Sequence, residues 1–266
     1  METGLTCATA PPAHRNGWAA WRSYVKLVRF HYHISFVIVL LGVLTVTRTI
    51  TVGLMASLAG LYVSFNILLY GAIYAINAIA DVESDREHPV KSQRPLAGGE
   101  IAVNSALRFA GVLLGCGLLS GGVFFGAGML AVYAGFVATN LFYTFIAKRI
   151  AYLEIVFNGL TYPLRYFMGA HLAGGRVSVY LLSLVFLVAV GACALRRRVE
   201  GTDRYSHGAL LWLEALPLAA MGLLRLIDRG SHNVFYICAG GTHLALVFGP
   251  KVFPPMRRGL LQVWTK

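Results

Sequence analysis

The carboxylates of this chain are concentrated in one polar passage, NAIADVESDREHPVKSQRP at positions 77–95, which separates two long apolar stretches. Asn77, Asp81 and Asp85 lie four residues apart. On a helix such residues drift by only about 40° per step and share one face. Two carboxylates and an amide are hard oxygen ligands that suit Mg²⁺, whose shell is completed by waters and substrate phosphates. We therefore expect these three residues to bind Mg²⁺ at the membrane boundary.

Two bases follow the carboxylates directly. Lys91 and Arg94 could supply counter-charges for the remaining oxygens of a metal-bridged diphosphate. The alternative interpretation is an ordinary solvated run of mixed charge at a helix end. The regular spacing reaches back into the apolar stretch, where Asn and Asp are costly to bury without a function, and this favours a phosphate-handling site.

The rest of the chain predicts the elements that position this passage. Of its 266 residues, 57% are hydrophobic, and the mean hydropathy is +0.66, as in integral membrane proteins. Small residues at close spacing, as in GVLLGCGLLSGG at 111–122, let helices approach closely in lipid. We expect an all-α, polytopic transmembrane bundle. Eight apolar runs approach the roughly 20 residues that cross a bilayer, at 34–47, 53–76, 103–124, 127–146, 150–172, 177–195, 208–226 and 233–250.

The distribution of bases predicts how the bundle is oriented. The segments on the side of the polar passage hold 17 Lys and Arg, and the opposite loops hold 4. By the positive-inside rule, the N-terminus and the polar passage are cytoplasmic. A basic inner rim facing anionic lipid or substrate explains most of the net charge of +12, so we expect no nucleic-acid partner. Residues 1–26 are expected to be a cytoplasmic lead-in, and residues 251–266 an interfacial tail.

The polar passage also resembles a known signature. Its pattern Asn-x-x-x-Asp-x-x-x-Asp, followed by His-Pro-x-Lys-x-x-Arg-Pro-Leu-Ala-x-Gly, is similar to the first motif of the UbiA superfamily of intramembrane prenyltransferases. LVRFHYHISFVIVLLGVL at 27–44 is similar to the first helix of that family. The resemblance implies a bundle of nine spans over 27–250 around a central cavity open to the cytoplasmic side. It also implies Mg²⁺ bridging a prenyl diphosphate to the aspartates, and an apolar tunnel for the isoprenoid tail.

A second polar loop, RRRVEGTDRYSH at 196–207, is expected on the same side. Many members of the family carry a second Asp-rich motif here that binds a second Mg²⁺. This chain has only Glu200 and Asp203 behind three arginines, so the second metal site stays open. Any one of the arginines is as well explained by a positive-inside anchor as by phosphate binding.

A narrower resemblance is to the branch that makes polyprenyl phosphoribose from a polyprenyl phosphate and phosphoribosyl diphosphate. That branch has a Lys-Arg-x-x-Glu pattern in this loop, which Arg196, Arg197 and Glu200 approach with Arg in place of Lys. It also has Tyr and Lys five apart before the fifth span and Leu-Arg later in that span. Those positions are matched by Tyr143, Lys148, Leu164 and Arg165, with Glu154 between them.

Arg165 stands out because it lies in the middle of an apolar run, where an unpaired charge is costly. Glu154 and Glu214 are its expected partners, and Glu154, Asn158 and Tyr162 form a stripe that could line the cavity. Other residues have simpler interpretations. His171 and His243 are expected to be packed, Arg29, His31 and His33 to anchor the first span at the interface, and Tyr62, Phe65, Tyr70 and Tyr74 to pack or to shield a carbocation.

The sequence therefore predicts a Mg²⁺-dependent intramembrane prenyltransferase that uses an isoprenoid diphosphate as donor to a membrane-associated acceptor. Transfer of phosphoribose to a polyprenyl phosphate is the alternative within the family. A membrane transporter and a catalytically inactive assembly protein are the alternatives outside it. The residues expected to act in catalysis are Asn77, Asp81, Asp85, Lys148 and Arg165. Those expected to bind substrate are Lys91, Arg94, Tyr143, Glu154, Asn158, Tyr162, Arg197, Arg198, Glu200 and Asp203.

Overall fold

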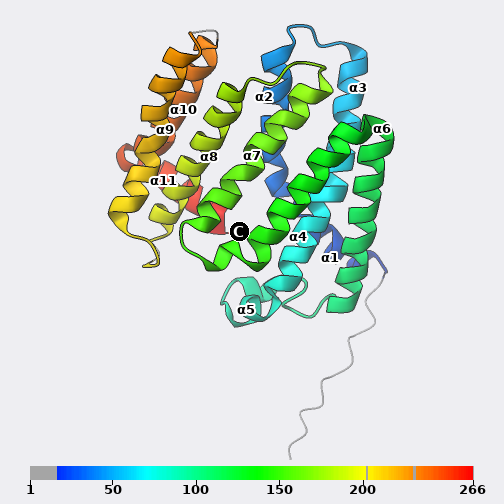
Figure 1. The fold of residues 1–266 in the computed structure, drawn as a ribbon. Helices are drawn as coiled ribbons and strands as arrows, with labels where there is room; N and C mark the ends of the chain where they lie inside the picture. The colour runs from blue at the N-terminus through cyan, green and yellow to red at the C-terminus, as the bar shows by residue number, and fades with distance from the viewer. Residues whose placement is uncertain (1–16, 202, 230–231, 266) are drawn as a thin grey trace, which may run out of the picture.

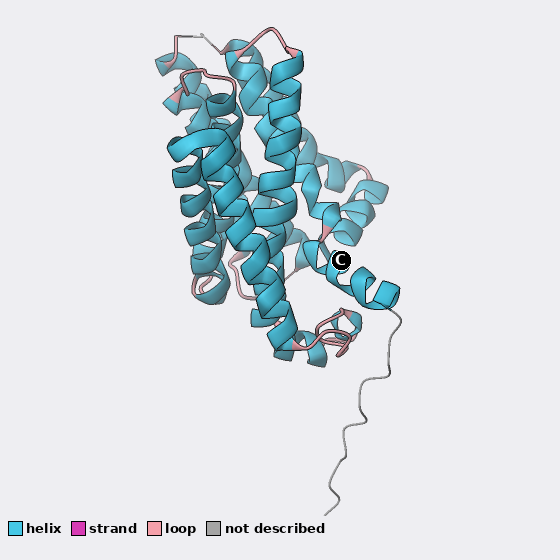
Figure 2. Ribbon diagram, turned by 90° about the vertical axis from the view of Figure 1, so that its right-hand side faces the viewer, coloured by secondary structure: helices cyan, strands magenta, loops and turns pink. Residues whose placement is uncertain are grey.

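The structure, a computed structural model, describes residues 17–201, 203–229 and 232–265. In these residues it contains helices and loops and no strand (Figure 2). Most of the expected lead-in at 1–26 lies outside the described residues. The α-helices are α1 Gly17–Val28, α2 Val37–Val46, α3 Val52–Leu61, α4 Tyr70–Ala80, α5 Val82–Glu87, α6 Val103–Phe145, α7 Leu153–Leu172, α8 Val179–Glu200, α9 His207–Ile227, α10 Asn233–Val252 and α11 Pro254–Thr265. Short 3₁₀ segments cover Phe30–Phe36, Lys91–Gln93 and Ala147–Arg149, and a π-helical segment, Tyr62–Leu69, joins α3 to α4.

The expected membrane class is confirmed. Each of the eight apolar runs lies largely in helix. Within the described residues, five helical stretches are long and apolar enough to cross a membrane: Trp21–Val46, Val52–Ala80, Val103–Arg149, Val179–Glu200 and His207–Ile227. The helices α7 and α10, with 20 residues each, cover two further runs. The nine spans implied by the family resemblance stay a prediction.

One of these stretches contains two predicted runs, because α6 folds back on itself. Gly126 breaks its helical geometry with φ 84° and ψ 176°, a conformation that glycine adopts without strain. The two arms then pack together, since a Cβ on Gly121 would lie 2.6 Å from the ring of Tyr133. The helical hairpin returns the chain toward the polar end of the bundle, where α6 ends (Figure 1).

Close backbone contacts hold the helices around the site, as the small residues predict. The helix α2 crosses α7, where a Cβ on Gly42 would lie 2.0 Å from the carbonyl oxygen of Tyr166. On the other side of the crossing, a Cβ on Gly169 would lie 1.8 Å from the carbonyl oxygen of Val39. Any side chain at these positions would separate the two helices.

The polar loops gather at one end of the bundle. The helix α5 and the loop to α6, the turn from α6 to α7, and the connection from α8 to α9 lie at the lower end in Figure 1. The 47–51 and 173–178 connections lie at the opposite end. The passage at 77–95 and the loop at 196–207 therefore share one end, as the sequence predicts.

Candidate active site

The end of α4 carries the three candidate metal ligands. The helix ends at Ala80, but its hydrogen-bond ladder continues through the turn into α5. The amide of Asp81 donates to the carbonyl of Asn77 at 3.0 Å, and the amide of Asp85 donates to the carbonyl of Asp81 at 2.8 Å. The helical spacing of four residues is thus kept across the junction, as the sequence predicts.

Two of these ligands face the last turn of α6. Thr144 donates a hydrogen bond to the amide oxygen of Asn77, and Lys148 pairs with the carboxylate of Asp81. Thr144 and Lys148 are themselves four residues apart, so two helical stripes running in the same direction meet side by side. Lys148, expected to be catalytic, is thereby brought to the metal site by the fold.

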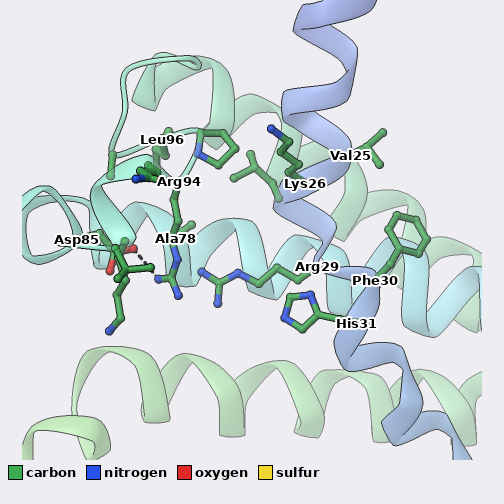
Figure 3. Close-up of a pocket in the computed structure, with 15 residues that line it drawn as sticks. Val25, Lys26, Arg29, Phe30, His31, Ala78, Asp85, Arg94 and Leu96 are labelled. Carbon is green, nitrogen blue, oxygen red and sulfur yellow. Dashed lines mark hydrogen bonds and ion pairs between the residues drawn. The ribbon is translucent and has the colours of Figure 1, made fainter. Parts of the chain in front are cut away.

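The third ligand is buried and paired with a base from the following loop. The Asp85 side chain is 6% exposed, and Arg94 Nη1 donates to its Oδ2 at 2.7 Å. The two residues line a cavity of about 540 Å³, which we call the Asp85 cavity. Its other walls come from Lys26, Arg29, Phe30 and His31 near the start of the first span, from Ala78 of α4, and from residues 90–97, including Lys91 (Figure 3).

The Asp85 cavity also corrects the prediction for Arg29. The sequence indicates an interfacial anchor, but Arg29 points into the cavity toward Arg94 (Figure 3). Arg29 adopts a left-handed backbone conformation, φ 53°, between α1 and the 3₁₀ segment. Such strain in a non-glycine residue is typical of functional positions. Its guanidinium lies 5.7 Å from the ring centroid of Tyr74, which orients it.

The charge of this cavity suits phosphate. Four bases, Lys26, Arg29, Lys91 and Arg94, line it together with a single carboxylate, that of Asp85. Like charges this close repel each other unless an anion lies between them. The cavity is therefore suited to a phosphate or diphosphate at the membrane boundary.

A second cavity of about 550 Å³ lies beyond Lys148, and we call it the Glu154 cavity. It is lined by Tyr143, Lys148, Glu154, Arg197, Gly201, Asp203, Arg204 and Tyr205. None of these residues has an aliphatic side chain, so the lining consists of charged groups, phenol rings with their hydroxyls, and backbone. The candidate metal site thus adjoins both cavities through its bases: Arg94, paired with Asp85, lines the first cavity, and Lys148, paired with Asp81, lines the second.

Glu154 accepts hydrogen bonds from two other residues of the second cavity. Its carboxylate is 4% exposed and is bound by Arg197 and by the hydroxyl of Tyr205. Burial and the hydrogen bond to Glu154 raise the pKa of Tyr205 above its usual value, because both oppose a second negative charge. Tyr205 lies outside the predicted site, and only the position of its loop beside Glu154 reveals it.

The three consecutive arginines of α8 point in different directions. Arg197 binds Glu154 and Glu200, with Nη1 at 2.7 Å from Glu200 Oε2. Arg198, expected to bind substrate, instead binds Glu214 of α9 in a fork at 2.5 and 2.9 Å. Arg196 also donates to Glu200, at 2.8 Å, so Arg196 and Arg197 share this carboxylate.

The expected pairing of Arg165 is wrong. Glu154 and Glu214, its expected partners, are engaged by Arg197 and Arg198. Arg165 is 2% exposed, and among the described residues no carboxylate lies within ion-pair distance of it. Its guanidinium lies instead among four aromatic rings, with centroids at 4.6 Å for Tyr70, 4.7 Å for Phe136, 5.7 Å for Tyr162 and 5.9 Å for Phe65.

This aromatic box changes the interpretation of the aromatic residues of the second span. Tyr70 and Phe65 already surround a permanent cation, so these faces are not available to shield a carbocation. Tyr162 of the predicted stripe joins the box, whereas the structure records no side-chain contact for Asn158. His243 is packed as expected: it is fully buried and bonds through Nε2 to the carbonyl of Glu214 at 2.7 Å.

The donor set at the end of α4 fits Mg²⁺. Asn77, Asp81 and Asp85 present three side chains with oxygen donors, which match the preference of this ion. Each is now bound by a donor from the protein: Thr144, Lys148 and Arg94. No cluster of three or more His, Cys, Asp or Glu suited to a metal exists in the described part of the chain, so waters or substrate oxygens must complete the shell.

Comparison with known proteins places the fold. Residues 34–206 match the model of the UbiA prenyltransferase family. A decaprenyl-phosphate phosphoribosyltransferase of Corynebacterium glutamicum is 33% identical over 126 residues, which are 45% of this chain and 37% of that protein. A protoheme IX farnesyltransferase of Herminiimonas arsenicoxydans is 29% identical over 190 residues, 65% of each chain. The matched region thus spans well under two thirds of the length of the first of these relatives.

A solved structure shares the architecture. The UbiA homolog from Archaeoglobus fulgidus bound to GPP and Mg²⁺ superposes with a TM-score of 0.71 at 18% identity, covering 86% of this chain and 87% of that one. The family match covers the polar passage, the helical hairpin of α6 and the arginines of α8, which are the segments that build the site. The chain belongs to the UbiA prenyltransferase family.

Proposed function

We propose that this protein is a Mg²⁺-dependent intramembrane transferase that acts on an isoprenoid phosphate or diphosphate. The observation that carries the proposal is that Asp81 and Asp85 are each paired with a base that lines a cavity: Arg94, the partner of Asp85, lines the Asp85 cavity, and Lys148, the partner of Asp81, lines the Glu154 cavity. Bound Mg²⁺ would neutralise the charge that develops on a departing diphosphate. The residues proposed to hold it are Asn77, Asp81 and Asp85.

The bases of the site have a role both without and with bound metal. Without metal, Arg94 and Lys148 neutralise the two carboxylates. If Asn77, Asp81 and Asp85 held Mg²⁺, Arg94 and Lys148 would be free to donate hydrogen bonds to phosphate oxygens. Lys91 and Arg29 then complete the cationic wall of the Asp85 cavity around the substrate. This exchange keeps the charge of the site balanced as substrate enters.

Between the two reactions of the family, the Glu154 cavity favours phosphoribosyl transfer. Its lining offers carboxylates, tyrosine hydroxyls and bases, which match the hydroxyls and phosphates of phosphoribosyl diphosphate. An aliphatic acceptor has no Val, Leu or Ile side chain to pack against in this cavity, whereas a flat aromatic acceptor could stack only on the rings of Tyr143 and Tyr205. The similarity to decaprenyl-phosphate phosphoribosyltransferases points the same way. In this reaction an oxygen of the lipid phosphate forms a bond to the ribose carbon, while the bond from that carbon to diphosphate breaks.

Prenyl transfer is the second candidate, supported by the fold match to a homolog that binds GPP and by the similarity to farnesyltransferases. The interior of the bundle supports prenyl transfer less, because the guanidinium of Arg165 already lies between the rings of Tyr70 and Phe136. A prenyl carbocation beside that guanidinium would be repelled.

Labelled substrates separate the two reactions. Purified protein in lipid nanodiscs is incubated with Mg²⁺ and either labelled phosphoribosyl diphosphate plus polyprenyl phosphate, or labelled isoprenoid diphosphate plus a membrane lipid extract. We expect label from phosphoribosyl diphosphate in the organic phase, and none after the Asp81→Asn substitution. Label transferred only from the isoprenoid diphosphate would establish prenyl transfer. Ion or solute flux in proteoliposomes without either product would support a transporter, and no activity of any kind would support the assembly protein.

We further propose that the mouth of the site is cytoplasmic. The polar loops and most of the bases lie at one end of the bundle, and short loops rich in Lys and Arg stay inside. The helix α11, which carries Arg257 and Arg258, is proposed to lie at the interface beyond the 27–250 domain.

A further inference from the structure

We infer that the guanidinium of Arg197 takes the place of a second metal ion, so that this active site holds one divalent cation and not two. The inference deepens the proposed function and rests on it for the first metal, at Asp81 and Asp85. The contacts of Arg197 with Glu154 and Glu200, at the edge of the Glu154 cavity, do not depend on that metal.

Two carboxylates that could form a second metal site share one guanidinium. Arg197 donates through Nη2 to Glu154 Oε2 at 2.6 Å and also through Nε to the other oxygen of Glu154. Its Nη1 donates to Glu200 Oε2 at 2.7 Å. The planar fork of arginine is suited to such paired contacts. Glu154 comes from α7 and Glu200 from α8, so the clamp joins two helices at the edge of the Glu154 cavity.

The oxygens of both carboxylates are already used. Besides Arg197, Glu154 Oε1 accepts a hydrogen bond from Tyr205, and Glu200 Oε1 accepts one from Arg196 at 2.8 Å. Two guanidinium groups balance these two carboxylates, just as Lys148 and Arg94 balance Asp81 and Asp85. The difference is that each base of the first site makes one contact with one carboxylate, whereas Arg197 holds Glu154 and Glu200 together by three contacts. A cation would have to break all three contacts, at a carboxylate of Glu154 that is only 4% exposed, which is unfavourable.

The clamp also explains a departure from the family pattern. Where many family members have a second Asp-rich motif, this chain has an arginine run followed by Glu200. A fixed cation at this place lines the Glu154 cavity whether or not metal is abundant. Arg197 is therefore a positioning residue: it holds Glu154 and, through it, Tyr205 at the cavity wall.

The experiment counts metal ions. Full-length protein in nanodiscs is titrated with Mn²⁺ alone, and electron paramagnetic resonance measures the free ion. We expect one bound Mn²⁺ per chain, lost in Asp81→Asn and unchanged in Glu200→Gln. We expect Arg197→Gln to gain a second Mn²⁺, because it leaves Glu154 without a base and Glu200 with Arg196 alone, and Arg197→Gln combined with Glu154→Gln to lose that ion again.

Arg198→Gln is the matched control, since it removes the neighbouring arginine from an equally buried carboxylate, Glu214. It should leave the count at one. The inference is overturned if the wild-type protein binds two ions and one is lost in Glu200→Gln, or if folded Arg197→Gln binds no more than Arg198→Gln. Should Arg197→Gln not fold, the Glu200→Gln count decides alone. A single bound ion that persists in Asp81→Asn would refute the metal site proposed at Asp81 and Asp85. It would not contradict the inference about Arg197.

Discussion

Two arginines of this protein, the buried Arg165 and the partly buried Arg197, should lose different amounts of stability on the same substitution. Arg165 lies among aromatic rings without a carboxylate, and Arg197 lies between two carboxylates. Methionine is similarly long and unbranched, so replacing either arginine with it removes the charge while retaining much of the packing. The difference in stability between the two variants therefore shows whether the substitution leaves a carboxylate without its base.

The structure sets the size of that difference. Arg165→Met loses close contacts with the rings of Tyr70 and Phe136, about 1 to 2 kcal/mol each when desolvated, and one hydrogen bond to a carbonyl, at 2.9 Å. It regains the several kcal/mol that burying an uncompensated charge costs, so the net change is within about 2 kcal/mol. Arg197→Met leaves Glu154 buried with an unpaired charge, a loss of about 3 to 5 kcal/mol.

Thermal unfolding in one detergent, followed by tryptophan fluorescence, measures the contrast. At about 2 to 4 °C per kcal/mol for a chain of this size, Arg197→Met should unfold roughly 6 to 20 °C below the wild type. Arg165→Met should stay within about 8 °C of it. If Arg165→Met unfolds at or below the temperature of Arg197→Met, the assignment of Arg165 as an unpaired charge in an aromatic box is refuted.

Three further predictions concern the fold, the loop and the orientation. Gly169→Val should abolish folded protein in size-exclusion chromatography, because its Cβ would lie 1.8 Å from a backbone oxygen of α2; Gly111→Ala, with nothing within 4 Å, should not. Burial and the neighbouring Glu154 raise the pKa of Tyr205 in the folded protein. The stability that Tyr205 contributes is therefore present below about pH 10 and is lost above that pH, because tyrosine in the unfolded chain ionises there. Tyr205→Phe should therefore reduce the loss of stability between neutral and strongly alkaline pH, and an unchanged pH profile would contradict the shift. In a cysteine-free background, Ser84→Cys in α5 should react with a membrane-impermeant maleimide only in opened cells, and Thr49→Cys in intact cells; the reverse pattern would invert the orientation.

The sequence predicts the helical spacing of Asn77, Asp81 and Asp85 better than the contacts between helices. The spacing of Asn77, Asp81 and Asp85 is a local property, and the ladder of hydrogen bonds through α4 and α5 preserves it. The two spans that meet at Gly126 can also be predicted, because two apolar runs follow each other in the chain with this glycine between them. These features depend on neighbours within a few residues.

Partners across helices could not be predicted in the same way. The three arginines of α8 look equivalent in sequence, but Arg196 and Arg197 share Glu200, Arg197 alone also reaches Glu154, and Arg198 binds Glu214. The position of Arg165 depends on rings from α4 and α6 that are distant in sequence, besides Tyr162 of its own helix. Arg29 faces the Asp85 cavity because its left-handed backbone turns the chain there, which no residue type around it signals.

Release of inorganic diphosphate tests the central claim most directly, because both candidate reactions produce it. Purified protein is supplied with polyprenyl phosphate and phosphoribosyl diphosphate, and separately with an isoprenoid diphosphate and membrane lipid, and released diphosphate is measured with and without Mg²⁺. We expect release with at least one donor that requires Mg²⁺ and falls at least 100-fold, roughly 2.7 kcal/mol, in Asp81→Asn. Release that is indifferent to Mg²⁺ and to Asp81, or no release from either donor, would contradict a metal-assisted transferase at this site.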